Sequence, residues 1–185
     1  MSAARLRPAA FLDRDGVLNL DTGYPHRLED LRLTPTAAKA VRLFNEADHL
    51  VVVVSNQSGV ARGLFGLEDV ERFNEALSAT LARSGGRVDA WYFCPFHREG
   101  VVPGFAIDHP DRKPNPGMIL RALHDWSIDP AASVLIGDQA SDMEAARRAG
   151  VAGLLVETDR CDLAAVARGW LAQRAPEPPQ REHGR

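Results

Sequence analysis

Short apolar runs that alternate with helical stretches constrain the fold of this chain more than any other feature of the sequence. Uninterrupted apolar runs are typical of strands buried on both faces of a parallel sheet. Four runs have this character, at 9–12, 50–54, 88–93 and 134–136, and a fifth at 153–156 can be added to them. Strands that alternate with helices predict a parallel sheet covered on both faces. We therefore expect an α/β chain with a three-layer, Rossmann-like parallel sheet.

Between these runs, apolar residues recur at helical spacing, and we interpret each stripe as a helix face packed in the core. Pro35 stands near the start of the first stripe, and Gly85-Gly86 end the second. The stripes are Ala37, Ala40, Val41, Phe44 and Ala47; then Val70, Phe73, Leu77 and Leu81; then Met118, Ile119, Ala122, Leu123 and Trp126. Two further helices are predicted at 142–149 and 161–171.

Length and composition fit one ordinary globular domain, which we place at residues 8–174. The chain has 185 residues and a net charge of −3, so its charge does not indicate a nucleic-acid partner. No apolar run reaches transmembrane length, and the apolar part of the basic N-terminal stretch is too short for a secretory signal. We therefore expect a cytoplasmic monomer that binds neither nucleic acid nor membrane. The Pro-rich, charged segment at 175–185 is predicted to be disordered.

One long segment, from Cys94 to Pro116, fits no helix or strand. It contains prolines at 95, 103, 110, 114 and 116. Loops of this length are uncommon in compact domains and are often functional. We expect a Pro-rich loop insertion at 94–112. A disulfide between Cys94 and Cys161 is not expected in a reducing compartment.

The segment FLDRDG, which includes the end of the first run, places two carboxylates at the mouth of a strand. Asp13 and Asp15 are two residues apart, so in an extended chain they point to the same side. One carboxylate can then serve as a nucleophile and the other as an acid and base. A surface turn is the alternative interpretation, because Asp and Gly are common turn residues.

Ligands of open α/β sheets bind beyond the carboxyl ends of the strands, so the polar residues at these ends should form one site. Residues 55–59 follow the second run and offer Ser55, two amides and a glycine, which suit phosphate oxygens. A polar turn in which Ser55 caps a helix is the alternative. Arg112 and Lys113 follow the long loop and either hold a phosphate dianion or form an ordinary basic surface pair.

The fourth run is followed by another carboxylate, Asp138, and Asp142 comes four residues later. Asp142 falls in the first turn of the next helix, where the helix dipole alone explains a carboxylate. Asp138 beside Asp13 favours Mg²⁺, which takes one or two carboxylates together with phosphate oxygens and waters. Four polar segments, each at a strand end, together predict a site for phosphate chemistry.

The order of these motifs resembles the haloacid dehalogenase-type phosphatases. In that family Asp-x-Asp is followed by Ser or Thr at the end of the second strand, then by Lys, then by Gly-Asp-x-x-x-Asp. The similarity covers residues 9–160, and LDTGY at 20–24, SNQSGVARG at 55–63 and DRKPNPGM at 111–118 resemble the branch that acts on heptose 1,7-bisphosphates. The histidinol-phosphate phosphatase branch shares DRDG, NQ and RKP but matches less well at GY and SGVARG.

The resemblance implies an essentially capless, Mg²⁺-dependent enzyme that hydrolyses a small sugar phosphate through an aspartyl-phosphate. Asp13 would be the nucleophile, Asp15 the acid and base, and Ser55 and Lys113 the groups that hold the phosphoryl group. Mg²⁺ would lie on the side chains of Asp13 and Asp138 and on the backbone carbonyl of Asp15. The implied substrate contacts are Asp21, Thr22, Gly23, Tyr24, Asn56, Gln57, Ser58, Arg62 and Arg112.

The long loop departs from the pattern of the family, which usually has Cys-Pro-His and then Cys-x-Cys around a structural zinc ion. This chain has CPFH at 94–97 and HPD at 109–111. The candidate Zn²⁺ ligands by residue type are Cys94, His97, His109 and Asp111. The alternative is a metal-free loop held by its prolines and by packing. Gln139 is a second departure, because relatives often carry Lys or Arg there.

Two functions of other kinds compete with hydrolysis. A phosphate-binding module without turnover would also use acidic strand ends and a lysine, but it has no need for Asp15. A phosphotransferase would need a cap to exclude water, and no insertion in this chain is large enough to build one. The preferred partner is therefore a small-molecule sugar phosphate, with histidinol phosphate or another small ester as the alternative substrate.

Overall fold

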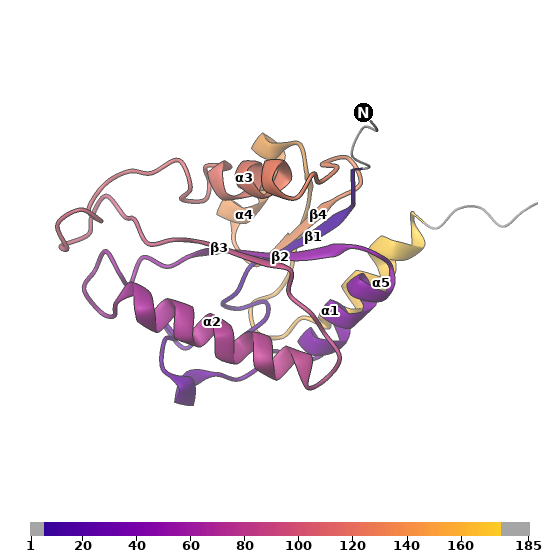
Figure 1. Ribbon diagram of the computed structural model, residues 1–185, viewed down its shortest axis with the longest axis horizontal. Coiled ribbons are helices and arrows are strands. Elements are labelled where there is room, and N and C mark those ends of the chain that lie inside the picture. Colours follow the sequence, from indigo (N-terminus) through magenta and orange to yellow (C-terminus); the bar gives the residue numbers. More distant parts are fainter. Residues whose placement is uncertain (1–5, 175–185) are drawn as a thin grey trace, which may run out of the picture.

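The structure, a computed structural model that describes residues 6–174, is built on a parallel sheet. Five strands are arranged in the order β3-β2-β1-β4-β5, of which Figure 1 labels the first four. They are β1 (Ala9–Leu12), β2 (Leu50–Asn56), β3 (Ala90–Cys94), β4 (Val134–Gly137) and β5 (Ala152–Leu155). The predicted α/β fold is confirmed, and each predicted strand is present.

Helices cover both faces of the sheet and complete the three predicted layers (Figure 1). One face carries α1 (Ala37–Glu46), α2 (Leu67–Ala82) and α5 (Leu163–Ala172), and the other carries α3 (Gly117–Asp125) and α4 (Ala140–Ala149). A single 3-10 turn, η1 (Leu28–Asp30), lies between β1 and α1 in the described part of the chain.

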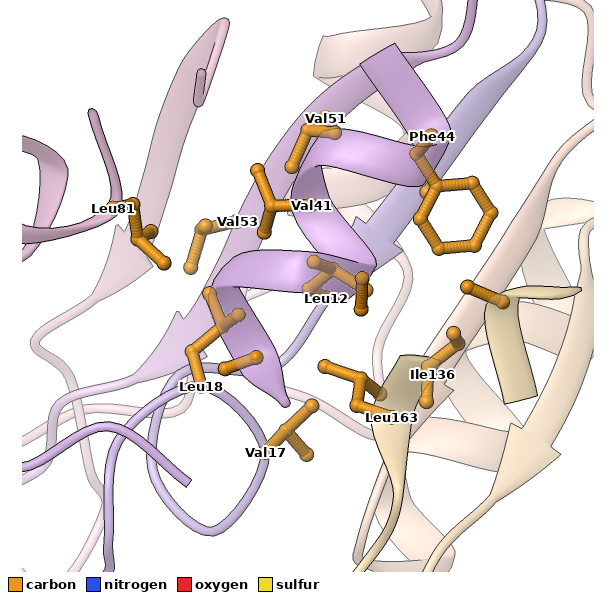
Figure 2. Packing of buried hydrophobic residues seen from close by; sticks show 14 of the residues in the cluster. Leu12, Val17, Leu18, Val41, Phe44, Val51, Val53, Leu81, Ile136 and Leu163 are labelled. Carbon is orange, nitrogen blue, oxygen red and sulfur yellow. The ribbon is translucent and has the colours of Figure 1, made fainter. Parts of the chain in front are cut away.

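The central strands are buried on both faces, which explains their uninterrupted apolar sequences. Leu12 and Ile136 pack with Val41 of α1 and Leu163 of α5 on one side (Figure 2). Phe11, the residue before Leu12, belongs to the second cluster, which lies against α3 and α4. Alternate residues of one strand thus enter opposite cores, because successive side chains of a strand point to opposite faces.

The structure differs from the predicted elements at their ends. The third strand begins at Ala90 instead of residue 88, because the Asp89 side chain accepts the Val51 N–H at 2.8 Å. Ala47 and Trp126 follow the last residues of α1 and α3 and are exposed, so they are not core residues. The fifth strand, β5, is an exposed edge strand, and it is not buried on both faces.

The carboxyl ends of the strands form the edge that matters for function. Within residues 6–174, this edge is bordered by the segments 13–36 and 95–116, and no second sheet covers it. None of the described helices is both long and apolar enough to cross a bilayer. The predicted disordered segment at 175–185 lies outside the described residues.

Candidate active site

Polar side chains from three strand ends line one cavity of about 300 Å³. Asp13 follows β1, Ser55 is the penultimate residue of β2, and Asp138 follows β4. These ends lie together because β1 pairs with β2 on one side and with β4 on the other. Lys113 reaches the same cavity from the segment between β3 and α3.

The ammonium group of Lys113 is buried at the base of this cavity. Its Nζ lies 2.8 Å from Asp13 Oδ1 and 2.6 Å from Asp142 Oδ1, and it donates to the Val54 carbonyl at 2.8 Å. Two hydrogen bonds of 3.0 Å join the Asn56 side chain to the Lys113 backbone N–H and carbonyl. The loop is thereby fixed to the end of β2, and the cation is held between two carboxylates.

These contacts decide the charge of the buried groups. Burial lowers the pKa of Lys113, but the Asp13 and Asp142 carboxylates outweigh burial and raise that pKa above its usual value. Burial also raises the pKa of Asp13 to about 7, with Lys113 acting against it and Asp142 acting with it. A further cation beside Asp13 would favour the carboxylate form that a nucleophile requires.

The carboxylates in this cavity fit a divalent cation. Asp13, Asp138 and Asp142 are the one group of three or more metal-ligating residues in 6–174 whose ligand atoms lie within 4.8 Å of one another. Asp138 Oδ2 accepts hydrogen bonds from Thr158 at 2.7 Å and Gln139 at 3.2 Å, whereas its Oδ1 is buried without a partner among the described residues. Both oxygens of Asp142 are engaged, one by the Gln139 N–H and the other by Lys113, whereas Asp13 and Asp138 each keep one oxygen without a hydrogen bond among the described residues. Asp13 and Asp138 are therefore the better ligands for a hard, oxygen-binding ion such as Mg²⁺.

Two glycines allow the backbone to approach these carboxylates. Gly16 has a φ of +82°, and a Cβ at this position would lie 2.4 Å from Asp138 Oδ2. A Cβ at Gly137 would lie 2.4 Å from the Asp142 side chain. Any larger residue would therefore push a carboxylate out of the site, and a residue at 16 would also strain the backbone.

Asp15 joins the same cavity through a glutamine. Its Oδ2 accepts a hydrogen bond of 2.9 Å from Gln57 Nε2, which also donates to Ser55 Oγ at 2.8 Å. Asp13, Asp15, Ser55 and Lys113, the four residues predicted to be catalytic, all line the cavity. The arrangement offers a nucleophile, a second carboxylate and a cation within one pocket.

Sequence reasoning missed two buried residues of this site. Asp142 was explained by helix capping, and its Oδ2 does accept the Gln139 N–H at 3.0 Å, but its other oxygen faces Lys113. Arg14 was given no role, yet its guanidinium is 2.9 Å from both Asp15 oxygens. The position of Asp142, one helical turn after a strand end, could have indicated its role, whereas nothing in the sequence indicates the direction of Arg14.

Comparison with known proteins identifies the family. Residues 111–179 match a family model described as HAD-hydrolase-like. A D-glycero-D-manno-heptose-1,7-bisphosphate 7-phosphatase of Thermosynechococcus vestitus is 48% identical over 156 residues, which cover 82% of this chain and 80% of that protein. The D-glycero-beta-D-manno-heptose-1,7-bisphosphate 7-phosphatase of Rhodopseudomonas palustris is 43% identical over 162 residues, covering 88% and 90%. This chain belongs to the heptose-bisphosphate phosphatase family.

A solved structure of this family has the same fold. It is D,D-heptose 1,7-bisphosphate phosphatase from B. bronchiseptica complexed with magnesium and phosphate. The two chains are 33% identical with a TM-score of 0.78, and the similarity covers 90% of this chain and 99% of the other. The chain is therefore a haloacid dehalogenase-like phosphatase, a phosphoric monoester hydrolase.

The substrate contacts implied by the heptose-bisphosphate phosphatase family are divided in the structure. Five of them line the cavity: Asp21, Gly23, Tyr24, Asn56 and Gln57. Thr22 is exposed and Ser58 is half-buried, and neither lines it. Asp21 closes a local turn by accepting the Gly23 N–H at 2.9 Å. Asp21, Gly23 and Tyr24 therefore border the mouth of the cavity as a structured loop.

The two arginines that the family resemblance implies lie beside this cavity instead of in it. Arg112 lines a second cavity of about 460 Å³, which shares Asn56 and Lys113 with the first. Arg62 Nη2 lies 3.3 Å from the Nε2 atom of His97, which lines the second cavity. Within residues 6–174 neither arginine forms an ion pair: Arg112 Nη1 donates to the Phe96 carbonyl at 3.3 Å, and Arg62 Nε is buried without a partner. Their charge is therefore available to an anionic ligand.

The four candidate zinc ligands do not converge on a common point in the described chain; they are Cys94, His97, His109 and Asp111. Phe96 stands at the second ligand position and stacks on the His109 ring, with centroids 4.1 Å apart. Asp111 is ion-paired with Arg121 at 3.1 Å. The residues therefore do not fit a structural zinc ion, which requires four ligand atoms in a tetrahedron. In the described chain this part of the loop is held by the stacking of Phe96 on His109 and by the ion pair of Asp111 with Arg121.

Proposed function

We propose that the chain is a Mg²⁺-dependent phosphatase that removes the C7 phosphate of D-glycero-D-manno-heptose 1,7-bisphosphate. The observation that carries this proposal is the contact of Lys113 with Asp13 in a cavity that also contains Asp15 and Asp138. The identity of 43–48% to relatives named for this substrate supports the choice of sugar. We further expect a monomer in the cytoplasm that binds neither nucleic acid nor membrane.

The two carboxylates of the Asp-x-Asp motif divide the chemistry. Asp13 Oδ1 accepts hydrogen bonds of 2.8 Å from Lys113 Nζ and from the Arg14 N–H, which leaves Oδ2 to attack phosphorus. The bond from phosphorus to the sugar oxygen breaks, and this oxygen takes a proton from Asp15. Asp15 then takes a proton from water, whose oxygen attacks the aspartyl-phosphate. The bond to Asp13 breaks, and inorganic phosphate leaves.

Positive charge is essential because an anionic nucleophile must approach an anionic phosphate. Mg²⁺, which we place on the side chains of Asp13 and Asp138 and on the Asp15 carbonyl, supplies part of this charge when it is bound. Lys113 supplies the rest and, with the Ser55 hydroxyl, holds the phosphoryl oxygens. The B. bronchiseptica relative was solved with magnesium and phosphate, which supports the choice of Mg²⁺ as the cation.

The residues around the second cavity favour a bisphosphate over histidinol phosphate. A cationic substrate would require carboxylates that are free to pair with it. Glu99 and Asp108 do line this cavity, but Arg98 and Arg112 line it as well, and Arg62 contacts His97 of the same lining, so its arginines outnumber its carboxylates. Arg98 lies 4.0 Å from Glu99, and Arg112 has no carboxylate partner in the described chain. An unpaired arginine beside Lys113 suits a second phosphate group.

Phosphate release from a panel of esters in Mg²⁺ tests the proposal. The panel contains both anomers of heptose 1,7-bisphosphate, fructose 1,6-bisphosphate, histidinol phosphate and simple esters, with Asp13→Asn as the background. We expect a preference of about tenfold or more for a heptose bisphosphate, equivalent to about 1.4 kcal/mol of transition-state stabilisation. Activity should disappear with EDTA and return with Mg²⁺. Preference for histidinol phosphate, or equal weak activity on every ester, would contradict the proposed substrate.

A further inference from the structure

Arg14, between the two aspartates of the motif, is a charged residue that is removed almost completely from solvent. It is 1% exposed and is the largest fully buried side chain of the described chain. Burial of an unpaired charge costs many kcal/mol, so a guanidinium group remains at such a position only when its donors are paired. The partners of Arg14 therefore show what this side chain does.

The guanidinium group is satisfied by three different segments. Nε and Nη2 donate to Asp15 Oδ1 and Oδ2, both at 2.9 Å, which is the fork geometry that only arginine provides. The two hydrogens of Nη2 are shared among Asp15 Oδ2, the Pro25 carbonyl at 2.8 Å and Gln57 Oε1 at 3.0 Å. Nη1 donates to Asn74 Oδ1 on α2 at 3.1 Å.

An aromatic ring completes this environment. The Arg14 guanidinium carbon lies 4.6 Å from the centroid of the Phe73 ring, a residue of α2. Arg14 is thus fixed by α2 on one side, and it connects Asp15 to the loop that carries Asp21, Gly23 and Tyr24 on the other. Rotation of Asp15 away from Arg14 would break two charge-assisted hydrogen bonds at once.

The pattern of hydrogen bonds distinguishes the two oxygens of Asp15. Oδ2 accepts from both Arg14 Nη2 and Gln57 Nε2, whereas Oδ1 accepts only from Arg14 Nε among the described residues. A carboxylate oxygen has two lone pairs, so Oδ1 keeps one for a proton that is exchanged with a ligand. Because Asp15 lines the cavity, Oδ1 is the atom from which the reacting proton can be delivered.

We propose that Arg14 is a positioning residue that aims Asp15 Oδ1 at the leaving oxygen and then at the attacking water. The proposal rests on the phosphatase chemistry described above, but it does not depend on which sugar phosphate is the substrate. Arg14 does not line the cavity, and Asp15 is the one hydrogen-bond partner of its guanidinium group to which we assign a proton transfer. Its loss should therefore impair the proton transfers and spare the attack by Asp13.

Two aryl phosphates separate these steps. The leaving group of 4-nitrophenyl phosphate departs without a proton, whereas that of phenyl phosphate needs one from Asp15. Arg14→Lys keeps the charge but removes the fork. In the first turnover with Mg²⁺, we expect this variant to release 4-nitrophenol within about threefold of the wild-type rate and phenol about thirtyfold more slowly. Steady-state turnover of 4-nitrophenyl phosphate should then be slow, because hydrolysis of the aspartyl-phosphate also needs Asp15, and one equivalent of 4-nitrophenol should appear as a burst.

A second variant covers the case in which Arg14→Lys does not fold. Asn74→Ala removes the partner of Arg14 Nη1 and leaves the fork with Asp15 in place. Its first-turnover rate should therefore fall about threefold more on phenyl phosphate than on 4-nitrophenyl phosphate. Glu75→Ala, an exposed neighbour on α2, is the matched control and should change neither rate.

The outcomes that overturn the proposal are distinct from those that concern the substrate. If Arg14→Lys lost the same fraction of its first-turnover rate on both aryl phosphates, Arg14 would be a merely structural residue. If it lost no rate on either, Arg14 would have no role in proton transfer. If the wild type hydrolyses the aryl esters but no heptose bisphosphate, only the proposed substrate fails. If the wild type hydrolyses neither 4-nitrophenyl phosphate nor phenyl phosphate, the proposed phosphatase chemistry fails, and the role of Arg14 fails with it.

Discussion

Asp142 uses its two carboxylate oxygens for different purposes. Oδ2 accepts the Gln139 N–H at the start of α4, and Oδ1 lies 2.6 Å from Lys113 Nζ. Both Asp142 and Lys113 are buried, so their charges depend on each other. Removal of one partner from a buried ion pair is strongly destabilising, because the other charge remains buried.

Asp142→Asn tests this dependence, because the asparagine oxygen can still cap α4 while the charge is lost. We expect the free energy of unfolding to fall by roughly 3 kcal/mol and turnover to fall by about tenfold or more, since Lys113 loses its orientation. Chemical denaturation and steady-state kinetics measure the two effects. Glu144→Gln is the matched control on the same helix, where Glu144 makes only exposed ion pairs with Arg147 and Arg148. If Asp142→Asn were as stable as the wild type, the ion pair between Asp142 and Lys113 would not stabilise the fold.

At the scale of single residues, the sequence allowed the strand-end residues of the site to be predicted, because the carboxyl ends of all strands in a parallel sheet lie at one edge. Asp13, Ser55 and Asp138 are examples. The role of Asp142 was missed because helix capping already explained an aspartate at that position, although its place one helical turn after a strand end could have indicated the contact with Lys113. The role of Arg14 could not be derived either, since a charged residue in a turn usually faces water.

The loop at 95–116 is the element that brings Arg112 and Lys113 to the site, and side-chain contacts hold it. Asp111 is ion-paired with Arg121 of α3, whose guanidinium carbon lies 5.3 Å from the Tyr92 ring of β3. A Cβ at Gly117 would lie 2.5 Å from Asp111 Oδ1, so this glycine permits the close approach. The loop is therefore connected to a helix and to a strand just before its two cations.

Asp111→Asn should loosen this connection, because it removes the charge and retains the size of the side chain. We expect kcat/KM to fall by about tenfold, since a small displacement of Lys113 is costly. The free energy of unfolding should fall by only about 1 kcal/mol, because Arg121 is half-exposed. Val101→Ser, at an exposed position of the same loop, is the control and should behave as wild type. Unchanged kcat/KM in Asp111→Asn would show that the loop is held by other contacts.

The same loop leads to a prediction on metal content. Because the four candidate ligands do not converge, purified protein should contain far less than one equivalent of zinc. Chelation with EDTA followed by Mg²⁺ should restore full activity and leave the melting temperature unchanged. Elemental analysis and thermal denaturation measure these results, and one equivalent of tightly held zinc would contradict them.

At the scale of elements, periodicity in the sequence predicted each strand and helix to within a few residues. It could not predict the internal structure of the loop, which has no period. The contacts that hold it, Phe96 with His109 and Asp111 with Arg121, join residues whose spacing follows no helix or strand pattern. Apolar runs also carry no information on neighbours, so the order β3-β2-β1-β4-β5 became known only from the structure.

The stability of the whole molecule depends on a histidine far from the active site. His49 lies just before β2, at the amino end of the sheet, and is almost fully buried. Its Nδ1–H donates to the Ala47 carbonyl at 2.9 Å, and its Nε2 has no partner among the described residues. Burial lowers the pKa of His49 below the usual 6.5, because a proton on Nε2 would be an unpaired charge.

His49 should therefore make the fold less stable as pH falls. Above pH 6.5 the ring is neutral in both states, and below it the unfolded chain binds a proton that the folded chain rejects. His49→Asn keeps a donor for the Ala47 carbonyl and cannot titrate. We expect the loss of stability between pH 7.5 and pH 5.5 to shrink by about 1 kcal/mol in this variant, measured by chemical denaturation. His124→Asn, whose side chain is 90% exposed, should leave the pH dependence as it is. Identical pH dependence in His49→Asn and wild type would show that His49 has no such effect.

The central position of β1 has a consequence for how the protein is made. Of the five strands described, β1 is the first to leave the ribosome, yet it pairs with β2 on one edge and with β4 on the other. Until Val134–Gly137 has been synthesised, one edge of β1 has unpaired backbone groups, and Asp138 is missing from the site. Incomplete chains should therefore be inactive and prone to aggregate through the open edge of β1. Activity during synthesis should appear only after the segment from β4 onward has emerged from the ribosome.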